Sequence, residues 1–123
     1  MIVLGIESSC DDTGIGIVTD DRRILAQTTY TQAREHLATK GVVPEIAARA
    51  HVSVMDELIR TAVDQAGITL HDIDAVAATC GPGLIGGVMV GMMTGKGLAS
   101  ALDRPFIAVN HLEGHALTVR LTH

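Results

Sequence analysis

The sequence predicts an α/β domain built on a mixed five-stranded sheet, with its elements in the order β-β-β-α-β-α-β-α. Two observations indicate this class. Three short apolar segments separated by tight polar turns open the chain, a pattern typical of an antiparallel meander. Segments with helical spacing then alternate with short buried strands, a pattern typical of parallel strands joined through helices.

The three opening strands are expected at residues 2–8, 14–20 and 24–30. The first reads IVLGIES and is apolar and rich in β-branched residues, as a central strand should be. The second alternates polar and apolar positions like a half-buried neighbour. Short polar turns separate the three segments, and turns of this length join antiparallel strands. The chain therefore begins with a meander.

A long amphipathic helix is expected over residues 44–66. Pro44 lies in its first turn, where a missing backbone N–H costs nothing, and Gly67 marks its end. Apolar side chains recur every fourth residue between these two points. This stripe predicts that one side of the helix packs on the sheet.

The rest of the chain predicts a strand at 73–80, a helix at 86–102, a strand at 106–110 and a third helix at 111–121. The helix at 86–102 is apolar on nearly every side, as a buried helix should be. The whole succession is the layout of a ribonuclease H-like half of the actin, hexokinase and Hsp70 superfamily. This is an analogy of fold, which carries no function by itself.

Length and composition favour one cytosolic, soluble domain. The 123 residues, 47% of them hydrophobic, can build a single core. No apolar stretch reaches the roughly 20 residues that span a bilayer, and the N-terminus lacks the features of a signal peptide. Cys10 and Cys80 form no disulfide or metal motif. A net charge of -5 gives no basic footprint for nucleic acid, so an RNA substrate would need phosphate contacts from elsewhere.

Glycines form two patterns between residues 80 and 97. The segment CGPGLIG contains GxGxxG, but no acidic residue ends a strand about 20 residues further on, as a dinucleotide site requires. Gly81 and Gly83 instead permit a tight turn and are candidate phosphate-binding residues. A second set with a spacing of four predicts close packing of the helix against this sheet or another chain: Gly83, Gly87, Gly91 and Gly95.

The turn ESSCDDTG, which begins at Glu7, concentrates hydroxyls and carboxylates where the first strand ends. Polar turns often merely close hairpins. This turn falls at the sheet edge where the parallel strands also end, which is where open sheets bind ligands. Its groups can donate hydrogen bonds to phosphates or hold a water or a metal. The candidate site residues here are Ser8, Ser9, Asp11 and Asp12.

His111 and His115 follow the fifth strand and are four residues apart. On a helix such residues share one face, so both imidazoles can reach one metal ion. Two ligands do not complete a catalytic site, which usually needs a third protein ligand and an open position. The pair is also compatible with an ordinary helix surface. Its place beside the polar turn favours metal binding.

Four segments in order resemble the amino-terminal part of the TsaD family, the tRNA N6-adenosine threonylcarbamoyltransferases formerly named O-sialoglycoprotein endopeptidases. They are GIESSCDDTGIGIV, GVVPEIAARAH, TCGPGLIGGVMVG and VNHLEGH. Ser8 stands where many members have Thr, a difference that keeps the hydroxyl. The resemblance implies that residues 1–123 form the amino-terminal actin-like ATPase subdomain of a two-domain protein whose second subdomain lies outside this chain.

The resemblance also implies a metal-dependent transfer of a threonylcarbamoyl group. The donor would be threonylcarbamoyl-adenylate and the acceptor N6 of the adenosine beside the anticodon of ANN-decoding tRNAs. Iron or zinc would be bound by His111, by His115 and by an aspartate of the second half, and ATP or an adenylate would bind in the full-length protein. Asp11 or Asp12 would orient the amine or a metal-bound water, and Ser8 or Ser9 the adenylate phosphate. This chain alone is expected to be inactive.

Two other functions stay open. A metalloendopeptidase is one, although Leu112 stands where the zinc motif HExxH places its glutamate. A non-catalytic scaffold is the other, because the paralogue TsaB shares the fold and lacks the histidine pair. TsaB pairs with TsaD through helices of the amino-terminal domains. The long helix and the glycine-lined helix would suit that interface, other proteins of the threonylcarbamoyl-adenosine machinery, or a homodimer.

Overall fold

The structure is a computed structural model that describes residues 1–9, 12–30, 44–83 and 85–112. Its elements are β1 (Ile2–Glu7), β2 (Thr13–Thr19), β3 (Ile24–Tyr30), α2 (Pro44–Ala66), η1 (Leu70–Asp72), β4 (Ala75–Gly81), α3 (Ile85–Leu102) and β5 (Phe106–Asn110). The predicted order is confirmed as far as β5, with boundaries shifted by two residues or fewer. The short 3-10 helix η1 was not predicted. The predicted helix at 111–121 falls mostly outside the described residues, which reach only its first two positions.

The five described strands form one mixed sheet in the order β3-β2-β1-β4-β5. β2 is antiparallel to β1 and to β3, whereas β4 is parallel to β1 and to β5. The predicted antiparallel meander and the mixed character of the five-stranded sheet are therefore confirmed. The carboxyl ends of β1, β4 and β5 meet at the same edge of the sheet.

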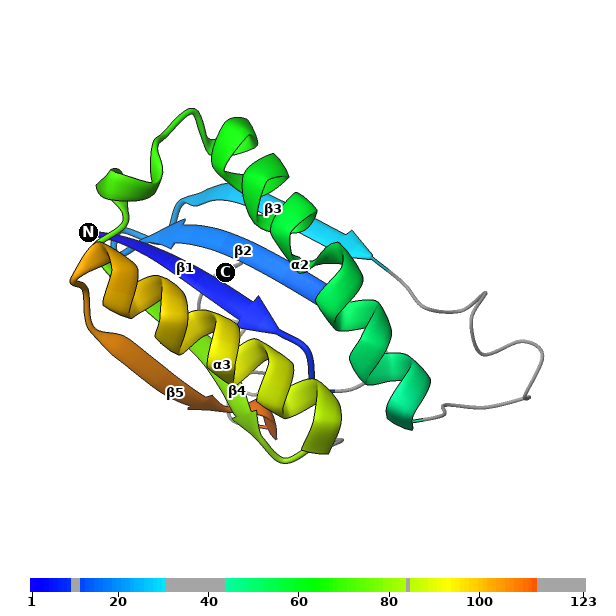
Figure 1. Cartoon of the computed structure of the whole chain (residues 1–123). Helices are drawn as coiled ribbons and strands as arrows, with labels where there is room; N and C mark the ends of the chain where they lie inside the picture. The colour runs from blue at the N-terminus through cyan, green and yellow to red at the C-terminus, as the bar shows by residue number, and fades with distance from the viewer. Residues whose placement is uncertain (10–11, 31–43, 84, 113–123) are drawn as a thin grey trace.

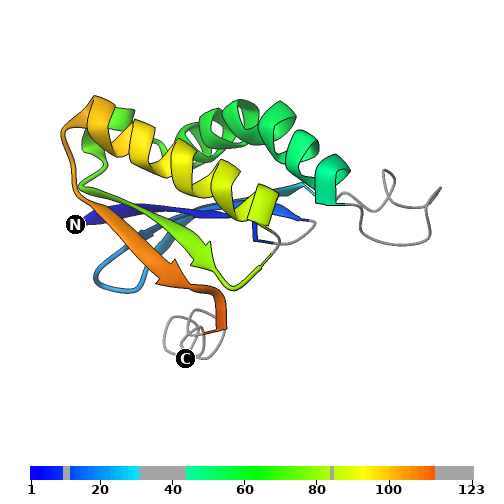
Figure 2. The same cartoon turned by 60° about the horizontal axis from the view of Figure 1, so that its bottom comes forward.

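The two described α-helices, α2 and α3, cover the same face of this sheet (Figure 1), and Figure 2 shows them as a layer above it. No helix in the described part of the chain is long and apolar enough to cross a membrane. The core lies between the two layers and consists of small and branched side chains. Its fully buried members include Leu4, Ile15, Ile17, Ile73 and Val76.

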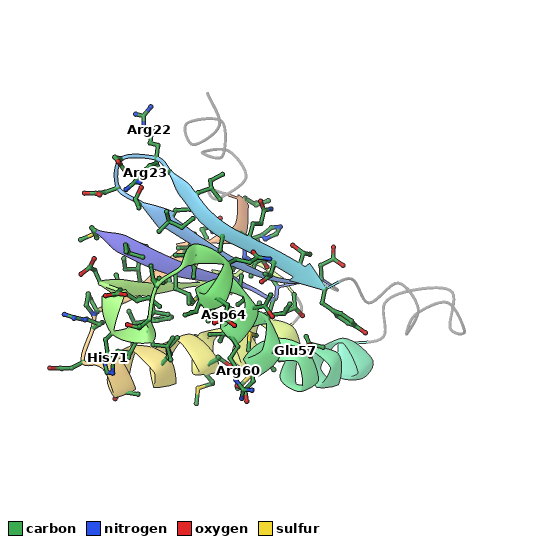
Figure 3. The ribbon with its side chains drawn as sticks, turned by 90° about the horizontal axis from the view of Figure 1, so that it is seen from above. Arg22, Arg23, Glu57, Arg60, Asp64 and His71 are labelled. Atoms are coloured by element: carbon green, nitrogen blue, oxygen red, sulfur yellow. The ribbon has the colours of Figure 1, made fainter. Side chains whose placement is uncertain are left out.

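The opposite side of α2 is polar, as the predicted stripe requires. Glu57, Arg60 and Asp64, which Figure 3 labels along this helix, are exposed. In contrast, Met55 and Ala62 are buried against the sheet. The helix therefore separates charged from apolar side chains by its own periodicity.

The glycine side of α3 packs on this sheet. A Cβ added at Gly91 would collide with the Ser8 hydroxyl, and one added at Gly95 would lie 2.8 Å from the Phe106 ring and 3.3 Å from the Ala78 Cβ. Real Cβ atoms do not approach other atoms so closely, so α3 can lie at this distance only because it lacks side chains there. The sequence left open whether the glycine side of this helix packs on this sheet or on another chain, and in the structure it packs on this sheet.

Alternation along β1 assigns its residues to the two faces of the sheet. Leu4 and Ile6 are buried under the helices. Val3, Gly5 and Glu7 point to the opposite face, because successive side chains of a strand alternate. Glu7 is thus the last residue of β1 and the first charged group on the face that neither α2 nor α3 covers.

Candidate functional site

A polar cluster lies at the sheet edge where the three parallel strands end. Glu7 ends β1, Thr79 lies near the end of β4, and His111 directly follows β5. The register pairs Ile6 with Ala78 and Thr79 with Val109, so these three positions come from adjacent strands at similar height. Their side chains meet although up to 104 positions separate them in the sequence.

The carboxylate of Glu7 is the centre of this cluster. Its Oε1 accepts hydrogen bonds from the Ser9 backbone N–H at 2.6 Å and from the Ser9 hydroxyl. Its Oε2 accepts a hydrogen bond from the Thr79 hydroxyl at 2.6 Å and lies 3.1 Å from Nδ1 of His111. That same Nδ1 lies 2.9 Å from the Ser9 hydroxyl oxygen. Four groups are therefore fixed around one half-buried carboxylate.

The pKa of Glu7 lies below its ordinary value. Burial is the largest single influence and raises this pKa, but the hydrogen bonds from Ser9, Thr79 and His111 together lower it by more. Each of these donors stabilises the ionised carboxylate. The side chain keeps 42% of its surface exposed, so water still reaches it and the cluster is open to a ligand.

The two serines of the turn face opposite sides of the sheet. Ser8 is fully buried under the helices, and its hydroxyl donates a 2.7 Å hydrogen bond to the carbonyl of Gly87 in α3. Ser9 is 1% exposed and belongs to the Glu7 cluster. Only Ser9 of the pair therefore contacts the other candidate residues. The role of Ser8 as a direct phosphate ligand stays a prediction.

The glycine turn after β4 closely approaches the serine turn. Gly81 has φ +142°, a conformation that residues with side chains rarely adopt, and it pairs with Asn110 of β5. A Cβ added at Gly83 would overlap the carbonyl oxygen of Ser9 and lie 2.6 Å from the Ser9 Cβ. The structure therefore brings the predicted phosphate-binding glycines to the edge that carries Ser9 and His111.

Of the remaining predicted site residues, the structure describes only Asp12. Asp12 is exposed and lines a groove on the sheet face opposite the helices. Asp11 and His115 lie outside the described residues, so their predicted roles are untested. Among the described residues, no group of three His, Cys, Asp or Glu side chains could hold a metal ion.

The groove beside Asp12 has a volume of about 620 Å³ and runs along the sheet face that neither α2 nor α3 covers. Its floor is largely apolar and rich in glycine, and Glu7 and Thr79 supply polar groups. Among the residues that line it are Val3, Gly5, Gly14, Gly16, Val18, Ala77 and Val109. The polar cluster therefore opens onto an apolar surface.

Sequence reasoning placed Glu7 in the polar turn but gave neither Glu7 nor Thr79 a role. The sequence signal that could have identified Glu7 is strand alternation. Glu7 is two residues beyond Gly5, so its side chain lies on the face of the sheet opposite Leu4 and Ile6. No sequence signal singled out Thr79, because its contact with Glu7 depends on the register between β1 and β4.

Comparisons with known proteins identify similar sequences. Residues 23–123 match the family model of TsaD, tRNA N6-adenosine threonylcarbamoyltransferase. A protein of that name from Paramagnetospirillum magneticum is 61% identical over 123 residues, which are 100% of this chain and 35% of the relative. Another from Sphingopyxis alaskensis is 60% identical over 120 residues, 98% of this chain and 35% of the relative. The chain thus spans about 35% of the length of these curated relatives.

Solved structures show the same fold. YeaZ from Pseudomonas aeruginosa superposes with a TM-score of 0.70 and 24% identity, over 89% of this chain and 45% of that one. RuvC from Thermus thermophilus, in complex with a Holliday junction substrate, gives a TM-score of 0.53 and 19% identity, over 95% of this chain and 69% of that one. Both likenesses concern the fold alone, and the predicted ribonuclease H-like architecture is confirmed.

Proposed function

The chain belongs to the TsaD family of tRNA N6-adenosine threonylcarbamoyltransferases, and we propose that it forms the amino-terminal subdomain of such an enzyme. The full protein would transfer a threonylcarbamoyl group from threonylcarbamoyl-adenylate to N6 of the adenosine beside the anticodon of tRNA. The observation that carries this proposal is the 61% identity over the whole chain to a relative of that name. The remaining part of the enzyme would supply the second wall of the site.

His111 is the metal ligand that this proposal assigns within the described residues, with His115 and an aspartate of the second subdomain as its partners. The surroundings of His111 fit that role. Metal-binding histidines almost always use their second ring nitrogen in a hydrogen bond to a carboxylate, carbonyl or water, and Nδ1 of His111 lies 3.1 Å from Glu7. When bound, iron or zinc supplies a Lewis acid that polarises a carbonyl oxygen.

The chain's own residues would bind and orient the adenylate. The Gly81–Gly83 turn and the Ser9 backbone lie at the mouth of the parallel strands, where open sheets bind phosphates. Asp12 at the rim of the groove, or its neighbour Asp11, would accept a hydrogen bond from the exocyclic amine and orient it for attack. Because N6 of adenine is a weak nucleophile, positioning of the two reactants should contribute more than any single base.

A chimera tests this function directly. This chain replaces the segment that it matches in the Paramagnetospirillum relative, and the purified chimera receives tRNA, threonylcarbamoyl-adenylate, metal and its partner proteins. Nucleoside mass spectrometry should detect threonylcarbamoyl-adenosine. The His111→Ala chimera should make at least about 100-fold less, because removing even a partner behind a metal ligand costs about 10- to 100-fold in activity. A folded chimera without activity, beside an active parent, would refute the proposal. The isolated chain should give no product.

A second role, binding of a TsaB-like partner, is favoured by the outer side of α3. Met89 and Met93, one turn apart, are 51% and 61% exposed although both are large apolar side chains. The glycine side of α3 faces this sheet, so a partner would contact the methionine side together with α2. YeaZ from Pseudomonas aeruginosa has the same fold as this chain. Light scattering of this chain with and without a TsaB-like protein would test the association, and a strict monomer in both samples would argue against it.

A further inference from the structure

We propose that Glu7 is a positioning residue that fixes the tautomer of His111, with the ring proton on Nδ1 and the lone pair on Nε2. The contact of Nδ1 with two oxygen atoms, Oε2 of Glu7 at 3.1 Å and Oγ of Ser9 at 2.9 Å, motivates this inference. The consequence for metal binding rests on the proposed function, whereas the tautomer itself does not.

Counting the protons in the cluster leaves one assignment. The Ser9 hydroxyl has a single hydrogen, which it donates to Oε1 of Glu7, and the Thr79 hydroxyl donates its hydrogen to Oε2. The Ser9 backbone N–H also points at Oε1, so three donors converge on the carboxylate, which acts only as an acceptor. Neither oxygen near Nδ1 has a hydrogen to give to it. Nδ1 must therefore carry the proton itself and donate it to Glu7 and Ser9.

A neutral imidazole with its proton on Nδ1 has its lone pair on Nε2. Nε2 is then the atom that can bind a metal without a prior exchange of the ring proton. A carboxylate behind the ring also holds its orientation and raises its basicity as a ligand. Glu7 therefore prepares His111 for metal binding, although Glu7 itself contacts neither metal nor substrate in this arrangement.

The isosteric change Glu7→Gln should reverse the tautomer of His111, from the proton on Nδ1 to the proton on Nε2. Two donors of Ser9 point at the Oε1 position, so the amide oxygen should occupy it and the amide NH2 should take the Oε2 position. That NH2 then faces Nδ1 of His111 and donates to it. Nδ1 must accept, and the proton moves to Nε2. Asp21→Asn is the matched control, because it also neutralises a carboxylate but lies in the exposed turn between β2 and β3.

Two-bond 1H–15N correlation spectra of the metal-free 123-residue chain report the tautomer of each histidine. The spectra are recorded above the ordinary histidine pKa of about 6.5, and His111→Ala assigns the signal. Wild type and Asp21→Asn should show the Nδ1–H form, and Glu7→Gln the Nε2–H form. A wild-type signal in the Nε2–H form overturns the inference without any variant. A Glu7→Gln signal that stays in the Nδ1–H form would mean that Glu7 does not fix it.

Zinc affinity of the chimera, which contains the second subdomain and thus all three proposed ligands, is measured by competition with a chromophoric chelator and separates this inference from the proposed function. Glu7→Gln should weaken zinc binding about 10- to 100-fold, the range seen when partners behind a metal ligand are removed. If wild type and His111→Ala bind zinc equally, the proposed metal site fails while the tautomer result still stands. If His111→Ala loses affinity but Glu7→Gln does not, the positioning role of Glu7 is refuted.

Discussion

Substitution of Gly91 by Ala should destabilise the fold even though alanine favours helices. Gly91 is buried where α3 crosses β1, and an added Cβ would collide with the Ser8 hydroxyl and lie 3.4 Å from Cγ2 of Ile6. In the interior of a helix the change Gly→Ala by itself gains about 1 kcal/mol. The collision works against this gain.

Gly97 in the same helix provides the matched control. It is exposed, and nothing lies within 4 Å of a Cβ added there. Gly97→Ala should therefore stabilise the protein by about 0.5 to 1 kcal/mol. Because both substitutions receive the same gain in helix propensity, the difference between their effects isolates the cost of packing at Gly91.

That cost can be estimated from the contacts. If α3 moves away from β1, overpacking costs about 1 to 3 kcal/mol. If Ser8 rotates instead, its buried hydroxyl loses the hydrogen bond to Gly87, which costs a similar amount, about 1 to 3 kcal/mol. The free energy of unfolding of Gly91→Ala should thus lie roughly 1 to 3 kcal/mol below that of Gly97→Ala by either route.

Urea unfolding followed by circular dichroism measures this difference by linear extrapolation. A double-mutant cycle identifies its source. Ser8→Ala removes the colliding hydroxyl and leaves the Ser8 Cβ at 3.4 Å, so Gly91→Ala should cost less in that background than in wild type. Equal stabilities of Gly91→Ala and Gly97→Ala would refute the view that the glycine stripe exists for contact with this sheet.

Three further predictions concern the turn and the helix surface. The pKa of Glu7 in the metal-free chain, measured by 13C NMR, should lie below its ordinary value of about 4.3. Because folding lowers this pKa, the ionised Glu7 stabilises the fold fully above the unfolded-state pKa, and this stabilisation is lost as pH falls through the folded-state pKa. Between these two pKa values the unfolding free energy should therefore depend less on pH in Glu7→Gln than in wild type, and an equal pH dependence would contradict this prediction. Gly83→Ala should lower the unfolding free energy by about 1 to 3 kcal/mol because its Cβ overlaps the Ser9 backbone, and an unchanged urea midpoint would show that the two turns can separate freely. Met93→Glu should leave the unfolding free energy within about 0.5 kcal/mol of wild type, since the side chain is 61% exposed. The same substitution should weaken binding of a TsaB-like partner, measured by light scattering. Unchanged binding would exclude this side of α3 as the interface.

The local patterns of the sequence predicted the elements well. Alternation in β1 and β2 and the four-residue stripe of α2 report which face of an element is buried, and these signals depend only on neighbours in the sequence. The same kind of signal could not identify the partner of the glycine stripe. A smooth side of α3 suits its own sheet and another chain equally, and the packing of Gly91 and Gly95 against the strands decides between them.

The polar cluster was harder to predict because its contacts are long-range. The hydrogen bond between Thr79 and Glu7 spans 72 positions and exists only in the register that pairs Ile6 with Ala78. The many hydroxyls and carboxylates of the turn after β1 did predict a polar site there, and Ser9 and His111 do contact each other in the structure. The central role of Glu7 required two facts that are absent from the sequence: which face the helices cover, and which strand lies beside β1.

Ser8 and Ser9 link the two sides of the sheet through one dipeptide. Ser8 anchors the turn to α3 through the carbonyl of Gly87, and Ser9 anchors it to Glu7 and His111 on the other face. Glycines of α3 and of the turn after β4 approach these serines so closely that a methyl group would collide with either. Larger side chains would therefore separate either the helix or the glycine turn from β1. Ser8 and Ser9 are therefore held in place from both faces of the sheet, and fixed side chains are what a site needs if positioning of reactants provides most of its effect.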